Sequence, residues 1–269
     1  MVHDSVVSCI GGTPVVRLSR LFPMERLSVL AKLELCNPGG SVKDRPARYI
    51  VEAGLRDGTI TSDTHLIESS SGNLGIALAM VARVYGLRFT CVVDPKIASA
   101  NLAILRRLGA TVDMVQEHDD QGGYLKTRIR RVHELVKRIP GSLWVNQYAN
   151  RKNWQAHFHG TAGEIVTDVG EHLDALVVGV STSGTDHGIV TPPSPGVSQI
   201  ARDRCRCCRL SHLWSSGRGR GTFRGSGRAA PQNCCRLKRL MTSSMSAIWN
   251  PSKAVESWLS RCPCPRLPY

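Results

Sequence analysis

Short apolar runs alternate with longer helical stretches from residue 29 onward. Apolar runs typical of buried strands lie at 29–35, 65–68, 88–94, 110–116 and 175–180. Stretches with helical spacing of apolar residues lie at 44–56, 74–85, 98–108, 123–138 and 154–169. Strands and helices that alternate in this way form parallel sheets covered by helices on both faces, so the sequence predicts an α/β fold.

The ends of the predicted helices carry residues that stop helices. Gly86 and Gly109 directly follow two of these helices, and Pro140 follows a third. Glycine readily adopts the left-handed conformation found after helices, whereas proline cannot continue one. The sequence therefore marks the ends of these helices as well as their apolar spacing, which strengthens the prediction of an α/β fold.

The periodic pattern ends after Thr185. Residues 1–185 carry a net charge of +3, whereas residues 186–269 carry +11 and seven of the ten cysteines. This tail is rich in Arg, Pro and Cys and has no sustained period of a strand or helix, which predicts an irregular or disordered segment. A change this abrupt is typical of a shift of reading frame, and we take that as the leading interpretation of residues 186–269.

Two functional alternatives for the tail stay open. The Arg-Gly segment 215–228 could bind nucleic acid through phosphate contacts and stacking. Cys205 and Cys208 have the C-x-x-C spacing of zinc sites, but no matching second pair follows. We therefore predict no metal site. The alternative for the tail is that the chain is an inactive, truncated or frame-shifted homologue of an enzyme and that its basic tail binds nucleic acid.

The composition of the first part is typical of a cytoplasmic protein. Residues 1–12 have no cationic segment followed by an apolar run, and no later stretch reaches the length of a membrane span. The three cysteines of this part, at positions 9, 36 and 91, do not form a disulfide framework. These features predict a cytoplasmic chain without a membrane segment.

Lys43 lies between the turn-prone segment "NPGGS" (37–41) and the predicted helix 44–56. The positive end of a helix disfavours an ammonium group and so favours the neutral amine, which can attack an aldehyde. An isolated lysine is more often a solvated surface residue. This segment alone therefore leaves both interpretations open.

Two further loops join a predicted strand to a helix and have anion-binding composition. The segment "ESSSGNLG" (68–75) offers hydroxyl and backbone N–H groups that could cradle a carboxylate, although simple helix capping by serine would look the same. The segment "GVSTSGT" (179–185) has the small, hydroxyl-rich composition of a phosphate cup. It is not a P-loop, because Thr185 stands where the lysine belongs. A lysine, a carboxylate loop and a phosphate cup together suggest pyridoxal phosphate acting on an amino acid.

Five segments resemble the successive motifs of the cysteine synthase family, the fold-type-II pyridoxal-phosphate enzymes. They are "IGGTPVVRL" (10–18), "AKLELCNPGGSVKDR" (31–45), "ESSSGNLGIALA" (68–79), "NQYAN" (146–150) and "VVGVSTSGT" (177–185). Their order and spacing agree with the family across residues 10–185. The resemblance implies a two-domain fold-type-II enzyme that uses pyridoxal 5'-phosphate, with Lys43 as its cofactor lysine.

The resemblance also implies a role for each residue of these motifs. Lys43 is expected to hold the cofactor as an internal aldimine and to act as the catalytic base, and Asn73 to hydrogen-bond the ring hydroxyl. The residues expected to surround the phosphate are Ser181, Thr182, Ser183, Gly184 and Thr185. The residues expected to bind the substrate carboxylate are Ser70, Ser71, Asn73 and Gln147.

The reaction implied by the resemblance is β-replacement on an O-activated serine. The favoured nucleophile is a sulfur compound, which gives cysteine or an S-substituted cysteine; the alternative is an amine, as in diaminopropionate-pathway synthases. "ESSSGN" and "QGGYLKTRI" (121–129) resemble the branch that holds those synthases and the phosphoserine-using cysteine synthases. Leu74 replaces a threonine that many relatives have. The arginines at 106, 107, 128, 130 and 131 could favour a phosphorylated substrate, but such spacing is more often a solvated helix face.

The resemblance places the chain in two domains and a tail. Residues 1–37 and 140–185 are expected to form an incomplete large domain, 38–139 the small domain, and 186–269 the tail. Relatives are usually homodimers, so a dimer acting on a small amino-acid substrate is expected. His157 is expected to be structural, because lone histidines usually are.

Overall fold

The computed structural model describes residues 2–23, 28–170, 173, 176–179 and 184–190. Contacts divide the chain into two units, Met1–Val16 with Lys32–Leu213, and Arg17–Ala31 with Trp214–Tyr269. The predicted site residues all belong to the first unit. The predicted domain boundaries after residues 37, 139 and 185 stay predictions.

The described elements follow the alternation that the sequence predicts. In chain order they are η1 (Val6–Cys9), β1 (Val15–Arg17), β2 (Leu30–Lys32), η2 (Glu34–Cys36), α1 (Asp44–Asp57), β3 (His65–Ser69), α2 (Asn73–Val84), β4 (Arg88–Val93), α3 (Ser99–Arg107), β5 (Thr111–Met114), α4 (Leu125–Arg138), β6 (Ser142–Trp144), α5 (Arg151–Ala156), η3 (His157–Ala162), α6 (Gly163–Val169) and α7 (Gly184–Val190).

A four-stranded parallel sheet confirms the predicted fold class. Its strand order is β5-β4-β3-β6, with Ile67 of β3 opposite both Thr90 of β4 and Trp144 of β6. Strands β1 and β2 form a separate two-stranded sheet. Because all four strands of the larger sheet run the same way, the loops that follow β3, β4 and β6 leave from one edge, where ligands of α/β proteins bind.

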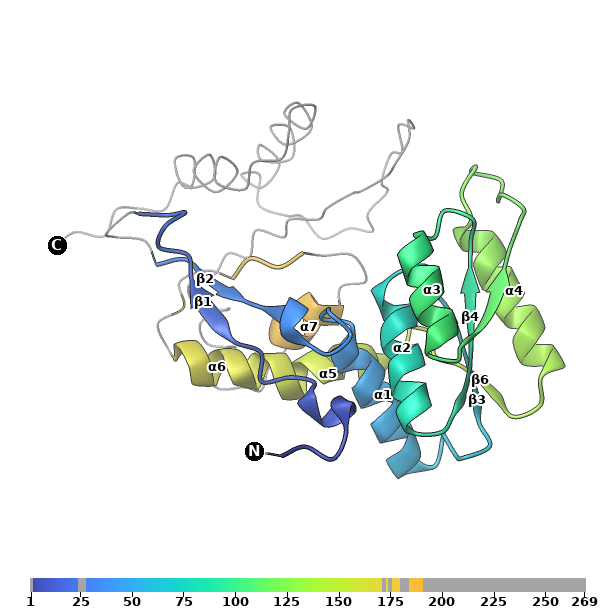
Figure 1. Ribbon diagram of the computed structural model, residues 1–269, viewed down its shortest axis with the longest axis horizontal. Coiled ribbons are helices and arrows are strands. Elements are labelled where there is room, and N and C mark those ends of the chain that lie inside the picture. The colour runs from blue at the N-terminus through green and yellow to red at the C-terminus, as the bar shows by residue number, and fades with distance from the viewer. Residues whose placement is uncertain (1, 24–27, 171–172, 174–175, 180–183, 191–269) are drawn as a thin grey trace, which may run out of the picture. The chain divides into compact units, whose positions relative to one another are not determined.

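Helices cover both faces of the larger sheet, with α2 and α3 on one face and α4 on the other (Figure 1). Side chains alternate between the faces along each strand. Leu66 and Cys91 pack in the core beneath α2, whereas Ile67 and Val92 pack with Val132 of α4. Burial on both faces explains why the central strand β4 is largely apolar.

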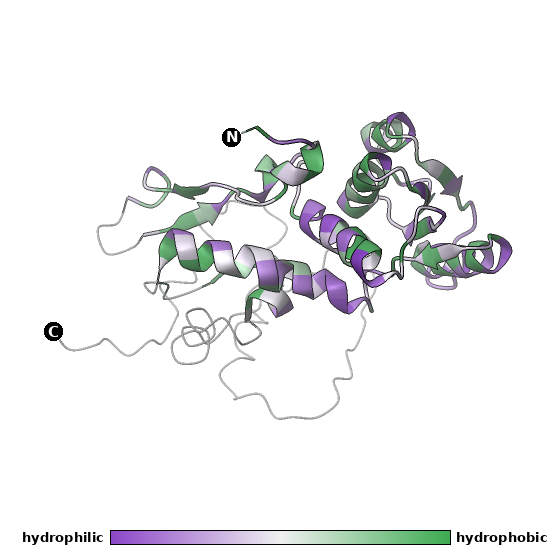
Figure 2. Ribbon diagram, turned by 90° about the horizontal axis from the view of Figure 1, so that it is seen from below, coloured by the Kyte–Doolittle hydropathy of each residue, from purple (hydrophilic) through white to green (hydrophobic). Residues whose placement is uncertain are grey.

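The two principal helices of this sheet differ in pattern because their surroundings differ. Helix α2 is buried at nine of its twelve residues, whereas α4 fully buries only Thr127, Val132 and Leu135 and turns most of its charged residues outward, with Arg128 as an exception. Figure 2 shows purple and green bands following one another along the helical ribbons. Helix α4 is therefore a surface helix held by one apolar stripe.

Two segments differ from the prediction. The run 29–35 forms a strand only at Leu30–Lys32, because a 3-10 turn begins at Glu34 and directs that carboxylate toward Arg45. The predicted strand at 175–180 is wrong for its described part, since 176–179 join neither sheet. Leu176 and Val178 instead pack beside Ile165 of α6 and Ile189 of α7.

The helical stretch predicted at 154–169 is present, but its middle part, η3, is a π-helix. Insertions of this kind are frequent at functional sites, because they change which side chains face a neighbouring element. No helix in the described part of the chain is both long and apolar enough to span a membrane.

Candidate functional site

Lys43 directly precedes α1 and is half-buried. The turn before it is held by side chains: Ser41 Oγ accepts a hydrogen bond from the Lys43 backbone N–H at 3.2 Å, and the Asp44 carboxylate accepts one from Gly39 N at 2.5 Å. Gly40 has φ +79°, a conformation that favours glycine. The sequence "NPGGSVKD" therefore builds a rigid turn that presents the lysine at the helix start.

Burial lowers the pKa of Lys43 below its ordinary value. No carboxylate pairs with its amine among the described residues, so nothing opposes this effect. A lysine that loses its proton more readily is a better nucleophile toward an aldehyde and a better base. The interpretation of Lys43 as an ordinary solvated cation therefore does not fit its surroundings.

The loop between β3 and α2 holds Ser70, Ser71 and Asn73. Ser70 is buried, and its Oγ accepts a hydrogen bond from Gly75 N at 3.1 Å. Asn73 is the first residue of α2 and is exposed. Ser70 thus acts partly as the helix cap that the sequence left open as an alternative, while the loop keeps Asn73 accessible.

Ser71 belongs to a charged cluster on the same loop. Its Oγ donates to Asp94 Oδ2 at 2.9 Å and accepts from Arg128 Nη1 at 2.9 Å, and Arg128 pairs with Asp94 at 3.1 Å. Arg128 is largely buried, and its Nε is a buried donor without a partner. The charge of Arg128 also acts on Tyr148, whose pKa burial raises and Arg128 lowers. Arg128 therefore lies beside two loops with predicted substrate residues.

Gln147 is buried and held through its backbone. Its N–H donates to Glu68 Oε2 at 3.1 Å, and its carbonyl accepts from Asn153 Nδ2 at 2.7 Å. The preceding Asn146 has φ +53°, which is unusual for a residue with a side chain. Glu68 is fully buried and also accepts hydrogen bonds from Ser69 N and Trp144 Nε1. It joins the end of β3 to the Gln147 loop.

The phosphate cup is described only at its end. Ser181, Thr182 and Ser183 lie outside the described residues, while Gly184 and Thr185 begin α7. A Cβ on Gly184 would lie 2.9 Å from the Asn153 side chain, so a larger residue does not fit there. Asn153 thus connects the phosphate cup to Gln147.

His157 connects the phosphate cup to Lys43. Thr185 Oγ1 lies 3.3 Å from His157 Nε2, and the positive charge of Lys43 helps to lower the pKa of His157. The structure therefore connects Gln147 with the end of the phosphate cup through Asn153, and it places Lys43 near enough to His157 for the lysine charge to act on that ring. Asn73 stands at the start of a different helix, α2, which packs against α1.

Sequence reasoning missed Asn153 and Glu68, and it treated Arg128 as part of a solvated face. For Asn153 a signal exists: Asn153 and His157 have the same four-residue spacing as Gly184 and Gly188. For Glu68 and Arg128 the partners come from distant segments, so only the fold reveals their burial.

A buried ion cluster lies directly behind the lysine. Arg45, two residues after Lys43, binds Glu34 at 2.7 Å and Glu164 at 2.6 Å, and it also donates to Thr13 Oγ1. Lys32 pairs with Glu164 at 2.9 Å. Burial raises the pKa of Glu164, but hydrogen bonds from Arg45 and Lys32 outweigh it and lower that pKa to about 2. The cluster fixes the start of α1 against α6 and thereby fixes Lys43.

The Glu164 pKa predicts an acid-sensitive fold. A carboxylate with a lowered folded-state pKa stabilises the protein above its ordinary pKa of 4.5, and this stabilisation disappears as the pH falls toward about 2. We expect about 2–3 kcal/mol from this residue, allowing for its partial exposure. Urea unfolding at pH 7, 4 and 3 measures it. A Glu164→Gln variant should be less stable at pH 7 and lose less stability on acidification; an identical pH profile would contradict the assignment.

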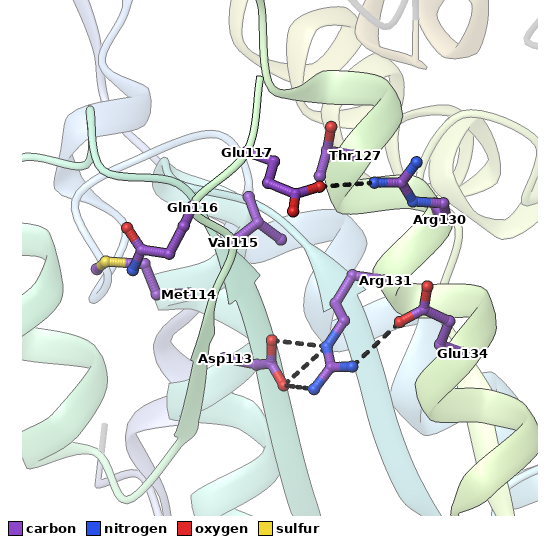
Figure 3. Close-up of a pocket in the computed structure, with 9 residues that line it drawn as sticks. All are labelled: Asp113, Met114, Val115, Gln116, Glu117, Thr127, Arg130, Arg131 and Glu134. Carbon is purple, nitrogen blue, oxygen red and sulfur yellow. Dashed lines mark hydrogen bonds and ion pairs between the residues drawn. The ribbon is translucent and has the colours of Figure 1, made fainter. Parts of the chain in front are cut away.

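A pocket of about 310 Å³ between the end of β5 and α4 lies apart from these loops (Figure 3). Arg131 pairs with Asp113 and Glu134, and Arg130 faces Glu117 at 3.5 Å. The charges of this pocket therefore satisfy one another. Among the described residues, no cluster of His, Cys, Asp or Glu could hold a metal ion.

Known proteins resemble the chain over most of its length. Residues 6–215 match the family of pyridoxal-phosphate dependent enzymes (PALP), a range that continues past Thr185 into the segment assigned to the tail. Two curated relatives are named N-(2-amino-2-carboxyethyl)-L-glutamate synthase. The relative from Ralstonia nicotianae is 55% identical over 206 residues, which cover 76% of this chain and 61% of the relative. The relative from Cupriavidus metallidurans is 57% identical over 189 residues, which cover 70% and 55%.

Solved structures give the same result. The crystal structure of an O-acetylserine dependent cystathionine beta-synthase from Helicobacter pylori has a TM-score of 0.64 and 36% identity, covering 71% of this chain and 61% of that one. The chain thus spans about three-fifths of the length of the proteins that it matches. The family match and these structures confirm the resemblance predicted from the motifs. The chain belongs to the pyridoxal-phosphate dependent enzymes, with the fold-type-II cysteine synthase-like proteins as its relatives.

Proposed function

We propose that this protein joins the β-carbon of an O-activated serine to the amine nitrogen of a second, acidic amino acid. The relatives' name describes a glutamate whose nitrogen carries a 2-amino-2-carboxyethyl group, which is serine without its hydroxyl. This supports the amine alternative over the sulfur nucleophile that the sequence alone favoured. Both reactions are β-replacements, so the choice concerns the nucleophile.

The surroundings of Arg128 are the observation that favours an acidic amine as the nucleophile. The Nη1 of Arg128 donates to Ser71 and pairs with Asp94 at 3.1 Å, while its buried Nε–H keeps no partner among the described residues. A buried, incompletely paired donor is costly unless a ligand completes it. Sulfide needs no cationic side chain for its recognition. The side-chain carboxylate of an acidic amino acid, or the phosphate of O-phosphoserine, does. A substrate with a second anionic group therefore suits this site best.

The residues present fit pyridoxal phosphate. Lys43 has an amine without a carboxylate partner in the described part of the chain and a pKa lowered by burial, and the described end of the phosphate cup offers the Thr185 hydroxyl beside His157. We assign the cofactor aldehyde to Lys43, its ring hydroxyl to Asn73, and its phosphate to Gly184 and Thr185 together with Ser181, Thr182 and Ser183. When bound, the cofactor supplies an electron sink next to the substrate α-carbon.

The protein's own residues account for the proton transfers. We assign the substrate carboxylate to Ser70, Ser71 and Gln147, and removal of the α-proton to the Lys43 amine. Lys43 removes that proton; the bond between the β-carbon and oxygen then breaks, and acetate or phosphate leaves with the electron pair. The incoming amine forms the new carbon–nitrogen bond and loses one proton, and Lys43 returns a proton to the α-carbon.

Product analysis tests the proposed nucleophile. The full chain, loaded with pyridoxal phosphate, receives O-phosphoserine or O-acetylserine together with glutamate, glutamine or sulfide, and mass spectrometry identifies the product. We expect the amine adduct with glutamate, little with glutamine, and less product with sulfide. Efficient cysteine formation without a glutamate adduct would overturn the proposal. Comparison of the two activated serines shows whether the leaving group also needs to be a phosphate.

Replacement of Arg128 should change specificity. Arg128→Gln keeps a planar amide but removes the charge, so we expect kcat/KM with glutamate to fall about 10- to 100-fold, as for loss of a charged hydrogen bond. Activity with an uncharged amine should change far less. Arg130→Gln, on the same helix but largely exposed, is the matched control and should behave like the parent. Equal losses with charged and uncharged nucleophiles would contradict a role in recognition.

A further inference from the structure

Two glycines bring α7 close to the π-helix η3. Gly184 and Gly188 lie one turn apart on α7, opposite Asn153 and His157. A Cβ on Gly188 would lie 2.6 Å from the Cβ of His157, closer than real side chains approach. The Trp154 carbonyl oxygen lies in the same direction, so only glycine permits this close packing of α7 on the turn that carries His157.

His157 is almost completely buried, with 1% of its surface exposed, and it makes two side-chain contacts. Its Nδ1 lies 3.0 Å from Thr161 Oγ1, and its Nε2 lies 3.3 Å from Thr185 Oγ1. Burial, with help from the charges of Lys43 and Arg45, lowers the pKa of His157 to about 4. The ring is therefore neutral near pH 7, with one N–H donor and one acceptor nitrogen.

The choice of tautomer decides what Thr185 can offer. If Nδ1 carries the hydrogen, the Thr185 hydroxyl must donate to Nε2 and presents only lone pairs to its surroundings. If Nε2 carries the hydrogen, it donates to Thr185 Oγ1, and the hydroxyl hydrogen is free for another acceptor. The Thr161 hydroxyl can then donate to Nδ1. Only the second arrangement gives an anion beside Thr185 a hydrogen-bond donor.

We infer that His157 is a positioning residue that holds the Thr185 hydroxyl as a donor to the cofactor phosphate. The inference depends on the proposed function, which assigns the phosphate to the cup ending at Thr185. It replaces the purely structural role expected from the sequence. It also explains the close packing of α7, because Gly184 and Gly188 allow the Thr185 hydroxyl to approach the His157 imidazole.

Two conservative variants separate the nitrogens of the ring. In His157→Gln the amide nitrogen reaches the position of Nε2 and can still donate to Thr185. In His157→Asn the shorter side chain replaces only Nδ1 and reaches Thr161. We expect the dissociation constant of pyridoxal phosphate, measured by the visible absorbance of the bound cofactor, to stay within about threefold for Gln and to rise about tenfold for Asn.

Pyridoxal, which lacks the phosphate, tests whether the effect acts through Thr185. His157→Asn should bind pyridoxal as well as the parent does, because the lost donor serves only the phosphate. Weaker binding of both compounds, or equal affinities of the Gln and Asn variants for pyridoxal phosphate, would overturn the inference. Thermal unfolding of each variant accompanies the titrations.

A double-variant comparison covers the case in which His157→Asn folds poorly. Thr185→Val removes the hydroxyl at nearly constant volume, and it should weaken pyridoxal phosphate binding as much as His157→Asn does. His157→Gln should then have no effect in the Thr185→Val background. If Thr185→Val binds pyridoxal phosphate normally, the inference fails although the enzyme assignment stands. If the parent forms no borohydride-fixable adduct at Lys43, the proposed function itself fails.

Discussion

Lys43→Ala is expected to abolish covalent attachment of pyridoxal phosphate and to lower kcat by about 10²–10⁴-fold, the usual contribution of a positioned general base. The residue is half-buried, and burial lowers its pKa, so its amine is prepared both to attack an aldehyde and to take the α-proton. Borohydride reduction followed by peptide mass spectrometry measures the attachment. The parent should carry the reduced adduct on the peptide that contains residue 43, and the variant should carry none.

Two controls make this result specific. Lys43→Arg keeps the positive charge but cannot form an imine or lose a proton near neutral pH, so it should be as inactive as Lys43→Ala. Lys137→Ala removes an exposed lysine of α4 and should leave both adduct and activity unchanged. Stability should not fall in Lys43→Ala, because the change removes a buried amine that no described carboxylate offsets. An adduct that persists in Lys43→Ala would show that another lysine holds the cofactor.

The sequence predicted the four-stranded sheet and the Ser70 loop because both depend on local rules. Strand β4 is buried on both faces and is largely apolar, and β3 buries Leu66 and Ile67 on opposite faces. Glycines with positive φ angles stand after α2 and α3, at Gly86 and Gly109. A loop between a parallel strand and a helix must lie at the ligand-binding edge. The place of the Ser70 loop thus followed from segment order alone, whereas Lys43 follows β2 of the separate two-stranded sheet, so its role was predicted only from the family resemblance.

The contacts among these loops could not be predicted, because they join distant segments. The contacts of Asn153 with Gln147 and with Gly184 depend on how α7 packs against α5. Arg128 and Arg130 lie on one helix and read alike in sequence, yet Arg128 is largely buried on Ser71 and Arg130 is largely exposed. The solvated-face interpretation holds for Arg130 and is wrong for Arg128. The positions of Arg128 and Arg130 along α4 do not by themselves show which side of the helix packs near the Ser71 loop.

The strand predicted at 175–180 shows a further limit of local pattern. An apolar, β-branched run has the propensity for a strand, but a strand forms only beside a hydrogen-bonded neighbour. The described part, 176–179, has no such neighbour in either described sheet and packs beside Ile165 and Ile189 instead. Leu176 and Val178 are half-buried and Val177 is exposed, so the apolar pattern predicted neither the burial nor the packing partners of this segment.

Arg45→Met is expected to destabilise the fold by about 3–5 kcal/mol, the usual cost of removing one partner from a buried ion cluster. The Arg45 side chain is only 4% exposed and neutralises both Glu34 and Glu164 directly behind Lys43. Its loss leaves two carboxylates near each other with only Lys32 to oppose them. Urea unfolding at pH 7 measures the change, and cofactor attachment at Lys43 should weaken in parallel.

Arg131→Met is the matched control, because Arg131 also binds two carboxylates, Asp113 at 2.9 Å and Glu134 at 3.1 Å, but is 32% exposed. Water screens such pairs, so we expect a loss of about 1 kcal/mol or less. The Arg45→Met deficit should also shrink as the pH falls below about 4.5, because Glu34 and Glu164, without Arg45, take up protons there. Equal losses in the two variants would mean that the number of ion pairs, and not their burial, holds the start of α1 in place.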